Sequence, residues 1–194
     1  MINKLSLKLS EKLGSKLKST DDEKEIYAYS LEVIFSLVLN LIILSMAAYI
    51  LGKIPELIIF IIFFSGLRTF AGGYHAKTHL ECMTISIIIF LISAMSNTWF
   101  HQFGTAIMII GIIMSILLVF FYAPTDSENK PLSKTETTRF MIISRGTVIL
   151  FSLVIIFLYY NRAQTDYIYI TAVVAMTIES LSLINLLNRR NKIN

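Results

Sequence analysis

The chain has 194 residues, of which 55% are hydrophobic and 15% charged, and its net charge is +4. A mean hydropathy of +0.69 excludes an ordinary water-soluble globule, because the polar residues are too few to cover the apolar ones. We therefore expect the chain to lie in a lipid bilayer. The polar stretches are each too short to bury a core of their own, which predicts one membrane-embedded domain over residues 1–194.

The first 30 residues form a charged leader. They lack the short apolar core and small-residue cleavage site of a secretory signal peptide, so we expect the first membrane span to act as the insertion signal. Leucines recur every four residues from Leu5 to Leu17, each preceded by a lysine. This pattern predicts an amphipathic helix at the membrane surface, with its lysines on anionic lipid headgroups. The same surface suits an amphipathic peptide partner.

Six apolar runs follow the leader, and most are close to the roughly 20 residues that cross a bilayer as a helix. The predicted fold is an all-α polytopic membrane protein. The second run is apolar without interruption only from Leu57 to Leu67, so the sequence leaves open whether it crosses fully. Polar residues inside the runs, such as Asn97 and Glu179, lie near run ends or face the interior of the bundle. The runs are 31–51, 54–71, 83–100, 107–122, 140–160 and 167–187.

The lysines and arginines predict the orientation of these spans, because cytoplasmic loops carry the excess of positive charge. When the six runs are threaded alternately, Lys53 and Arg162 fall on one side and the basic clusters on the other. We therefore expect both termini and the polar stretch 68–82 to face the cytoplasm. The clusters on that side are the leader lysines, Arg68 with Lys77, the linker 123–139 with Arg145, and Arg189, Arg190 and Lys192 at the C-terminus.

The polar stretch 68–82 contains the chain's one cysteine, Cys82, seven residues after His75. Paired glycines, Gly72 and Gly73, end the preceding helix and allow a sharp turn. If a new helix starts directly after them, His75 and Cys82 share one face, two turns apart. An imidazole that accepts the thiol proton produces the nucleophilic thiolate. Backbone amides of the glycine turn would stabilise the oxyanion.

Two other interpretations of this stretch stay open on the residues alone. His75, His79 and Cys82, with Glu81, have the types and spacing of zinc ligands, but a second segment normally completes such a site, and His101 lies on the opposite side. Alternatively, the stretch lines the cavity of a small transporter, although no pair of broken helices in two halves is visible. A free cysteine is also more often a small buried apolar residue than a nucleophile.

The segment from Arg68 to Cys82 resembles the signature of the accessory gene regulator B (AgrB) family, with Ala71-Gly72-Gly73-Tyr74-His75-Ala76-Lys77 at its centre. The segment from Ala123 to Leu132 resembles the loop that this family carries between its later spans. The chain length, the six runs and the basic leader agree with the same family. The resemblance therefore covers nearly the whole chain.

This resemblance implies a membrane cysteine endopeptidase of Gram-positive quorum sensing, which processes a small propeptide called AgrD. Cys82 would be the nucleophile and His75 its base. Cleavage would leave an acyl-enzyme thioester, and a thiol or hydroxyl of the peptide would then close a thiolactone or lactone ring. The resemblance also implies a homodimer, and we expect no cofactor and no nucleic-acid partner.

Further roles follow from the same resemblance. Arg68 matches a family position and would clamp a carboxylate of the propeptide or anchor the loop at the headgroups. Among the residues themselves, Asp126 in the linker is the candidate carboxylate for orienting the imidazole, with Glu81 and Ser65 as alternatives. Cationic side chains beside the site would attract the acidic C-terminal segment of the propeptide. These side chains are Lys77, Lys130 and Lys134.

Overall fold

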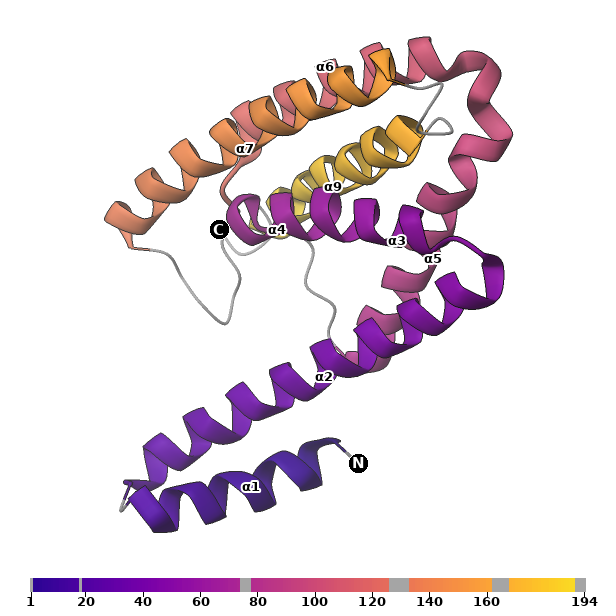
Figure 1. Ribbon diagram of the computed structural model, residues 1–194. Coiled ribbons are helices and arrows are strands. Elements are labelled where there is room, and N and C mark those ends of the chain that lie inside the picture. Colours follow the sequence, from indigo (N-terminus) through magenta and orange to yellow (C-terminus); the bar gives the residue numbers. More distant parts are fainter. Residues whose placement is uncertain (1, 18, 74–77, 126–132, 162–167, 191–194) are drawn as a thin grey trace. The chain divides into compact units, whose positions relative to one another are not determined.

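The computed structural model describes residues 2–17, 19–73, 78–125, 133–161 and 168–190, with side chains at all of these positions except 2, 4, 79 and 185–190 (Figure 1). Across these ranges the chain forms helices and turns and contains no strand. Four helical stretches are long and apolar enough to cross a membrane, and a fifth apolar helix, Ile168–Ile184, is shorter. The prediction of an all-α membrane protein is confirmed.

The chain divides into two compact units, Met1–Ala47 and Ala48–Asn194. The expectation of a single peptidase domain over the whole chain stays a prediction. The first unit consists of helix α1, Ile2–Leu17, and most of the long helix α2, Asp21–Leu51. A capping box starts α2, in which the Thr20 amide donates to Glu23 and the Glu23 amide to the Thr20 hydroxyl.

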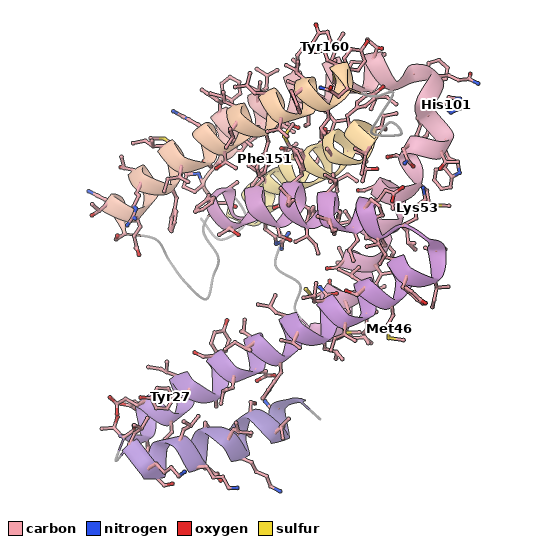
Figure 2. All side chains as sticks on the ribbon, in the orientation of Figure 1. Tyr27, Met46, Lys53, His101, Phe151 and Tyr160 are labelled. Atoms are coloured by element: carbon pink, nitrogen blue, oxygen red, sulfur yellow. The ribbon has the colours of Figure 1, made fainter. Side chains whose placement is uncertain are left out.

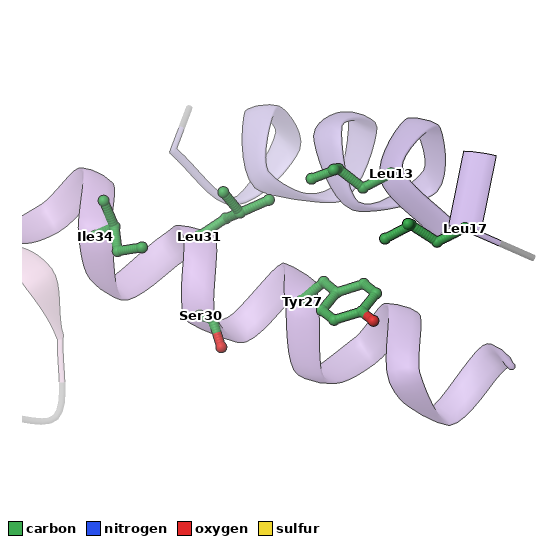
Figure 3. A pocket seen from close by; sticks show the side chains of 6 residues that line it. All are labelled: Leu13, Leu17, Tyr27, Ser30, Leu31 and Ile34. Atoms are coloured by element: carbon green, nitrogen blue, oxygen red, sulfur yellow. The ribbon is translucent and has the colours of Figure 1, made fainter. Parts of the chain in front are cut away.

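Helix α1 lies alongside α2 and has two different faces (Figure 3). Its small residues Ser6 and Ser10 are buried, whereas the leucine stripe from Leu5 to Leu17 is exposed. Leu13 and Leu17 line a shallow apolar hollow of about 250 Å³, together with residues of α2. The exposed leucines agree with the predicted amphipathic surface helix, because such a helix needs its apolar stripe free to enter the lipid.

In the second unit, the second apolar run, for which the sequence left a full membrane crossing open, forms one uninterrupted helical stretch from Ile54 to Ala71. It consists of α3, Ile54–Phe60, one π-helical turn η1, Ile61–Ser65, and α4, Gly66–Ala71. Pro55 occupies the first turn, where its missing N–H costs no hydrogen bond. At 1.5 Å per residue this stretch is about 27 Å long, which is close to the thickness of a bilayer core.

The next two runs form α5, His79–Phe100, and α6, Gly104–Tyr122. They are joined by a short 3-10 turn, His101–Phe103, at which the chain changes direction (Figure 1). Helix α7, Lys134–Tyr160, begins with a complete capping box between Ser133 and Glu136. The C-terminal helix α9 spans Ile168–Arg190.

Helix α9 is the central helix of the second unit. It contacts α6 and α5 most extensively and also touches α3, η1, α4 and α7. Its side chains Ile170, Val173 and Met176 are fully buried. The glycine at 111 of α6 permits the close approach, since a Cβ there would lie 2.6 Å from Val173 Cγ2.

A buried polar cluster lies at the start of α3. Lys53, labelled in Figure 2, directly precedes this helix, and its Nζ lies 2.7 Å from Glu56 Oε1. Asn97 of α5 donates to the same oxygen at 3.1 Å. Lys53, one of the two basic residues predicted to lie opposite the basic clusters, is therefore neutralised by a carboxylate.

Candidate active site

The proposed nucleophile lies in the first turn of α5. Thr78 caps this helix: its hydroxyl accepts from the Glu81 amide at 3.2 Å, and its carbonyl accepts from the Cys82 amide at 3.0 Å. The side chain of Cys82 is exposed.

The condition that a helix starts directly after the paired glycines and runs without a break to Cys82 is not met. Thr78 has φ −132° and ψ 152°, which is an extended conformation, and α5 starts only at His79. The physical reason is the cap, because a threonine followed three residues later by a glutamate favours a helix start over a helix interior. A helix shared by both residues is therefore interrupted at Thr78, and the placement of His75 lies outside the described residues.

Several predicted site residues lie outside the described residues. These are His75, Lys77, Asp126 and Lys130, and the side chain of His79 is likewise not described. Their roles stay predictions. Lys134 is described, as an exposed first residue of α7.

The paired glycines end α4 in conformations that suit glycine. Gly72 has φ 82° and Gly73 has φ 144°, both in the region that side chains rarely adopt. The amide of Thr125 donates to the carbonyl of Ala71 at 3.0 Å. A Cβ on Gly72 would lie 2.5 Å from both the carbonyl and the hydroxyl oxygen of Thr125. The start of the linker 123–139 thus packs against the glycine turn, which brings the two segments of the family signature together.

Arg68 pairs with a residue of the C-terminal helix. Its Nη1 lies 3.2 Å from Oε2 of Glu179, and the carboxylate is fully buried. The guanidinium also lies over the ring of Phe64, 5.7 Å from its centroid. A buried carboxylate needs such a partner, because an isolated charge is costly in an apolar surrounding.

Glu179, Ser182, Arg68 and Gly73 form one cluster, called the Glu179 cluster below. A Cβ on Gly73 would collide with Oε1 of Glu179 and would lie 2.9 Å from Oγ of Ser182 and 3.3 Å from Nη1 of Arg68. The sequence indicated that Glu179 could face the interior, but not which residue it meets. Arg68 and Glu179 are 111 residues apart, and no local pattern connects them.

The family model of Accessory gene regulator B matches residues 6–183, which include α5, both glycines of the turn and the Glu179 cluster. The chain belongs to the accessory gene regulator B family. The resemblance carried by the stretch 68–82 and the linker is thereby confirmed.

Three relatives, all called putative AgrB-like proteins, illustrate the degree of similarity within the AgrB family. The chain is 30% identical to the protein of Clostridium beijerinckii over 64% of each chain. It is 33% identical to that of Clostridium acetobutylicum over 68% of this chain and 63% of the relative. It is 30% identical to that of Clostridium perfringens strain SM101 over 83% of this chain and 80% of the relative. The chain thus spans slightly less than two thirds of the first two relatives. No solved structure matches the chain.

Proposed function

We propose that this AgrB-family protein is a membrane cysteine endopeptidase that cleaves a small AgrD-like propeptide in peptide quorum sensing. The observation that carries the proposal is the exposed thiol of Cys82 in the first turn of α5, in a segment that the family model covers. A buried thiol would be a packing residue, whereas an exposed thiol at the polar end of an apolar helix is accessible to a peptide.

The proposed reaction starts when His75 accepts the Sγ proton of Cys82. The thiolate attacks the carbonyl carbon of the scissile peptide bond and forms a tetrahedral oxyanion. When the C–N bond breaks, His75 returns the proton to the leaving amine, and the C-terminal segment departs. The remaining peptide is then held on Cys82 as a thioester.

Ring closure is the second proposed step. A thiol or hydroxyl of the bound peptide attacks the thioester carbonyl, and the Cys82 sulfur leaves. His75 accepts the proton of the attacking group and passes it to the Cys82 sulfur. Transfer between two thiols exchanges bonds of similar energy, so it needs no ATP provided that water is kept out. A thiol of the propeptide would give a thiolactone and a hydroxyl a lactone.

Other residues support these steps in the proposal. The amides of the Gly72-Gly73 turn are candidates for stabilising the oxyanion. Arg68 has five N–H donors, so Glu179 need not be its sole carboxylate partner and the propeptide can supply another. Asp126 would orient the imidazole. The side chains of Lys77, Lys130 and Lys134 would attract the acidic segment of the propeptide.

The proposed setting is the cell membrane of a Gram-positive bacterium. Both termini and the stretch 68–82 would face the cytoplasm, where the leader lysines meet the anionic inner leaflet. The proposed assembly is a homodimer. Neither a cofactor nor a nucleic acid takes part in the proposed reaction.

Co-expression with the cognate propeptide tests this function. We expect wild type to cleave the propeptide and to form a covalent peptide adduct that hydroxylamine releases. Cys82→Ala and His75→Ala should each lower cleavage at least about 100-fold, since both groups act in the same step. The measurement is the ratio of cleaved to intact propeptide, normalised to the amount of enzyme in the membrane.

His101→Ala is the matched control, because this exposed histidine lies in the turn at the other end of α5. It should cleave like wild type. Cleavage by a Cys82→Ala variant at the wild-type rate would reject the cysteine mechanism. Loss of wild-type activity in a metal chelator, with no covalent peptide adduct on Cys82, would instead support a zinc hydrolase.

A further inference from the structure

The Glu179 cluster combines full burial with incomplete pairing. Glu179 has a side chain with 0% exposure, and its Oε2 is held by Arg68 at 3.2 Å. Among the described residues, its other oxygen, Oε1, has no partner in hydrogen-bonding geometry, but the buried hydroxyl of Ser182, which also has none, is a neighbouring group that can donate to the carboxylate. Leaving such groups without a donor is costly in a folded protein. The Ser182 hydroxyl, on the side that Oε1 faces, can supply such a donor.

The backbone of Gly73 lies on that side. A Cβ at this position would collide with Oε1, so the absence of a side chain is what lets the chain pass over the carboxylate. Gly73 is the last described residue before the segment that carries His75, which follows two residues later. The carboxylate thus lies where the chain leaves α4 for the proposed catalytic segment.

Stability alone does not account for this arrangement. A buried ion pair is often replaceable by apolar residues at no loss of stability, because desolvation of the two charges offsets their attraction. The second unit contains another buried glutamate of the same kind, Glu56, which is 7% exposed and paired with Lys53. Arg68 lies twelve positions after Glu56, about 18 Å along the helix, and the two pairs share no partner.

We propose that Glu179 is a positioning residue for the proposed catalytic segment. Through its Oε2 it fixes Arg68, and its Oε1 lies against the backbone of Gly73, where only a residue without a side chain fits. The two contacts together hold the exit from α4 in one conformation and so define where His75 meets Cys82. This inference rests on the proposed function. Glu179 touches no reacting atom, and its effect on the reaction is exerted through the position of the base.

The test compares Glu179→Gln with the matched variant Glu56→Gln in membranes that also contain the cognate propeptide. Both substitutions keep the side-chain shape and replace the buried carboxylate of an ion pair by a neutral amide. We expect Glu179→Gln to lower the rate constant for acylation of Cys82 by about 10- to 100-fold, with KM within about twofold of wild type. Glu56→Gln should cleave at the wild-type rate at an equal amount of membrane protein.

A second measurement follows the thiol without any propeptide. Iodoacetamide should alkylate Cys82 more slowly in Glu179→Gln than in wild type, and at the rate of His75→Ala, because the base no longer reaches the thiol. Glu179→Asp retains the charge and should restore part of both rates.

Three outcomes would overturn the proposal. If KM rises and the alkylation rate stays at the wild-type value, the glutamate acts only through substrate binding by Arg68. If Glu56→Gln and Glu179→Gln lose activity equally, the role is merely structural. If Glu179→Gln cleaves like wild type while Cys82→Ala does not, the positioning role is rejected and the proposed function stands.

Discussion

At the scale of single residues, the glycines with positive φ differ in what surrounds them. Gly52, Gly72 and Gly73 all have φ between 65° and 144°. A Cβ on Gly52 would have no atom within 4 Å, whereas a Cβ on Gly73 would meet the Glu179 cluster. The backbone conformation therefore favours glycine at all three positions. Only in the turn after α4 would a side chain also collide with neighbouring atoms.

The variants Gly73→Ala and Gly52→Ala separate these two effects. Each should lose about 1–2 kcal/mol from the strained backbone. Gly73→Ala should also lower propeptide cleavage at least about tenfold, because the added methyl group displaces the chain that leads to His75. Cleavage per enzyme molecule in membranes is the measurement. If both variants were equally active, the contact with Glu179 would have no part in the reaction.

At the scale of elements, helix starts depend on short local signals, while helix contacts depend on distant residues. Thr20, Thr78 and Ser133 each cap a helix and are each followed three residues later by a glutamate. The packing of α6 on α9 depends instead on a stripe of positions along α6: Gly104, Met108, Gly111, Ser115 and Val119 are buried. Small residues at such a stripe let two helices approach closely in a membrane.

The glycines of α6 and α7 offer a paired test of this packing. Gly111→Ala would place a Cβ 2.6 Å from Val173 Cγ2 and 2.9 Å from Thr177 Oγ1, so it should destabilise the protein by about 1–3 kcal/mol. Gly146→Ala, on an exposed face of α7 with no atom within 4 Å, should instead be neutral or stabilise by up to about 1 kcal/mol. Thermal unfolding in detergent measures both. Equal melting temperatures for the two variants would contradict close packing of α6 on α9.

At the scale of the whole molecule, the distribution of charge predicts how the chain is oriented in the membrane. The proposed cytoplasmic side has the leader, the stretch 68–82, the linker and the C-terminal basic residues. On the opposite side, Lys53 is paired with Glu56, which removes part of the positive charge there. Basic residues are paired with carboxylates on both proposed sides, as Arg68 is with Glu179, so the predicted orientation depends on where the lysines and arginines lie and not on net charge.

The single thiol of the chain makes this orientation directly measurable. A membrane-impermeant maleimide should leave Cys82 unlabelled in intact cells and should label it in inside-out vesicles, because the N-terminal end of α5 is expected at the cytoplasmic rim. On a Cys82→Ala background, Gln102→Cys in the turn after α5 should show the reverse pattern. Labelling of Cys82 in intact cells would place the thiol outside and reject the proposed site.

Much of the fold and part of the site could be predicted from the sequence. Apolar runs predict membrane helices because each run satisfies its own backbone hydrogen bonds, whatever its neighbours are. The exposed cysteine and the glycine turn belong to the continuous stretch 68–82, so local reasoning reaches them. The same local reasoning missed the start of α5, although Thr78 and Glu81 contain the signal for a cap.

The sequence by itself determined the helices, their membrane character and the family signature, because these depend on composition and on residues that are neighbours along the chain. Only the tertiary structure decided that Arg68 meets Glu179, that Thr125 meets Ala71 and that α9 is the central helix. Arg68 and Glu179 are 111 positions apart, and Thr125 and Ala71 are 54 positions apart. They depend on how the helices pack, and no periodicity in the chain encodes which polar residue of one helix faces which residue of another.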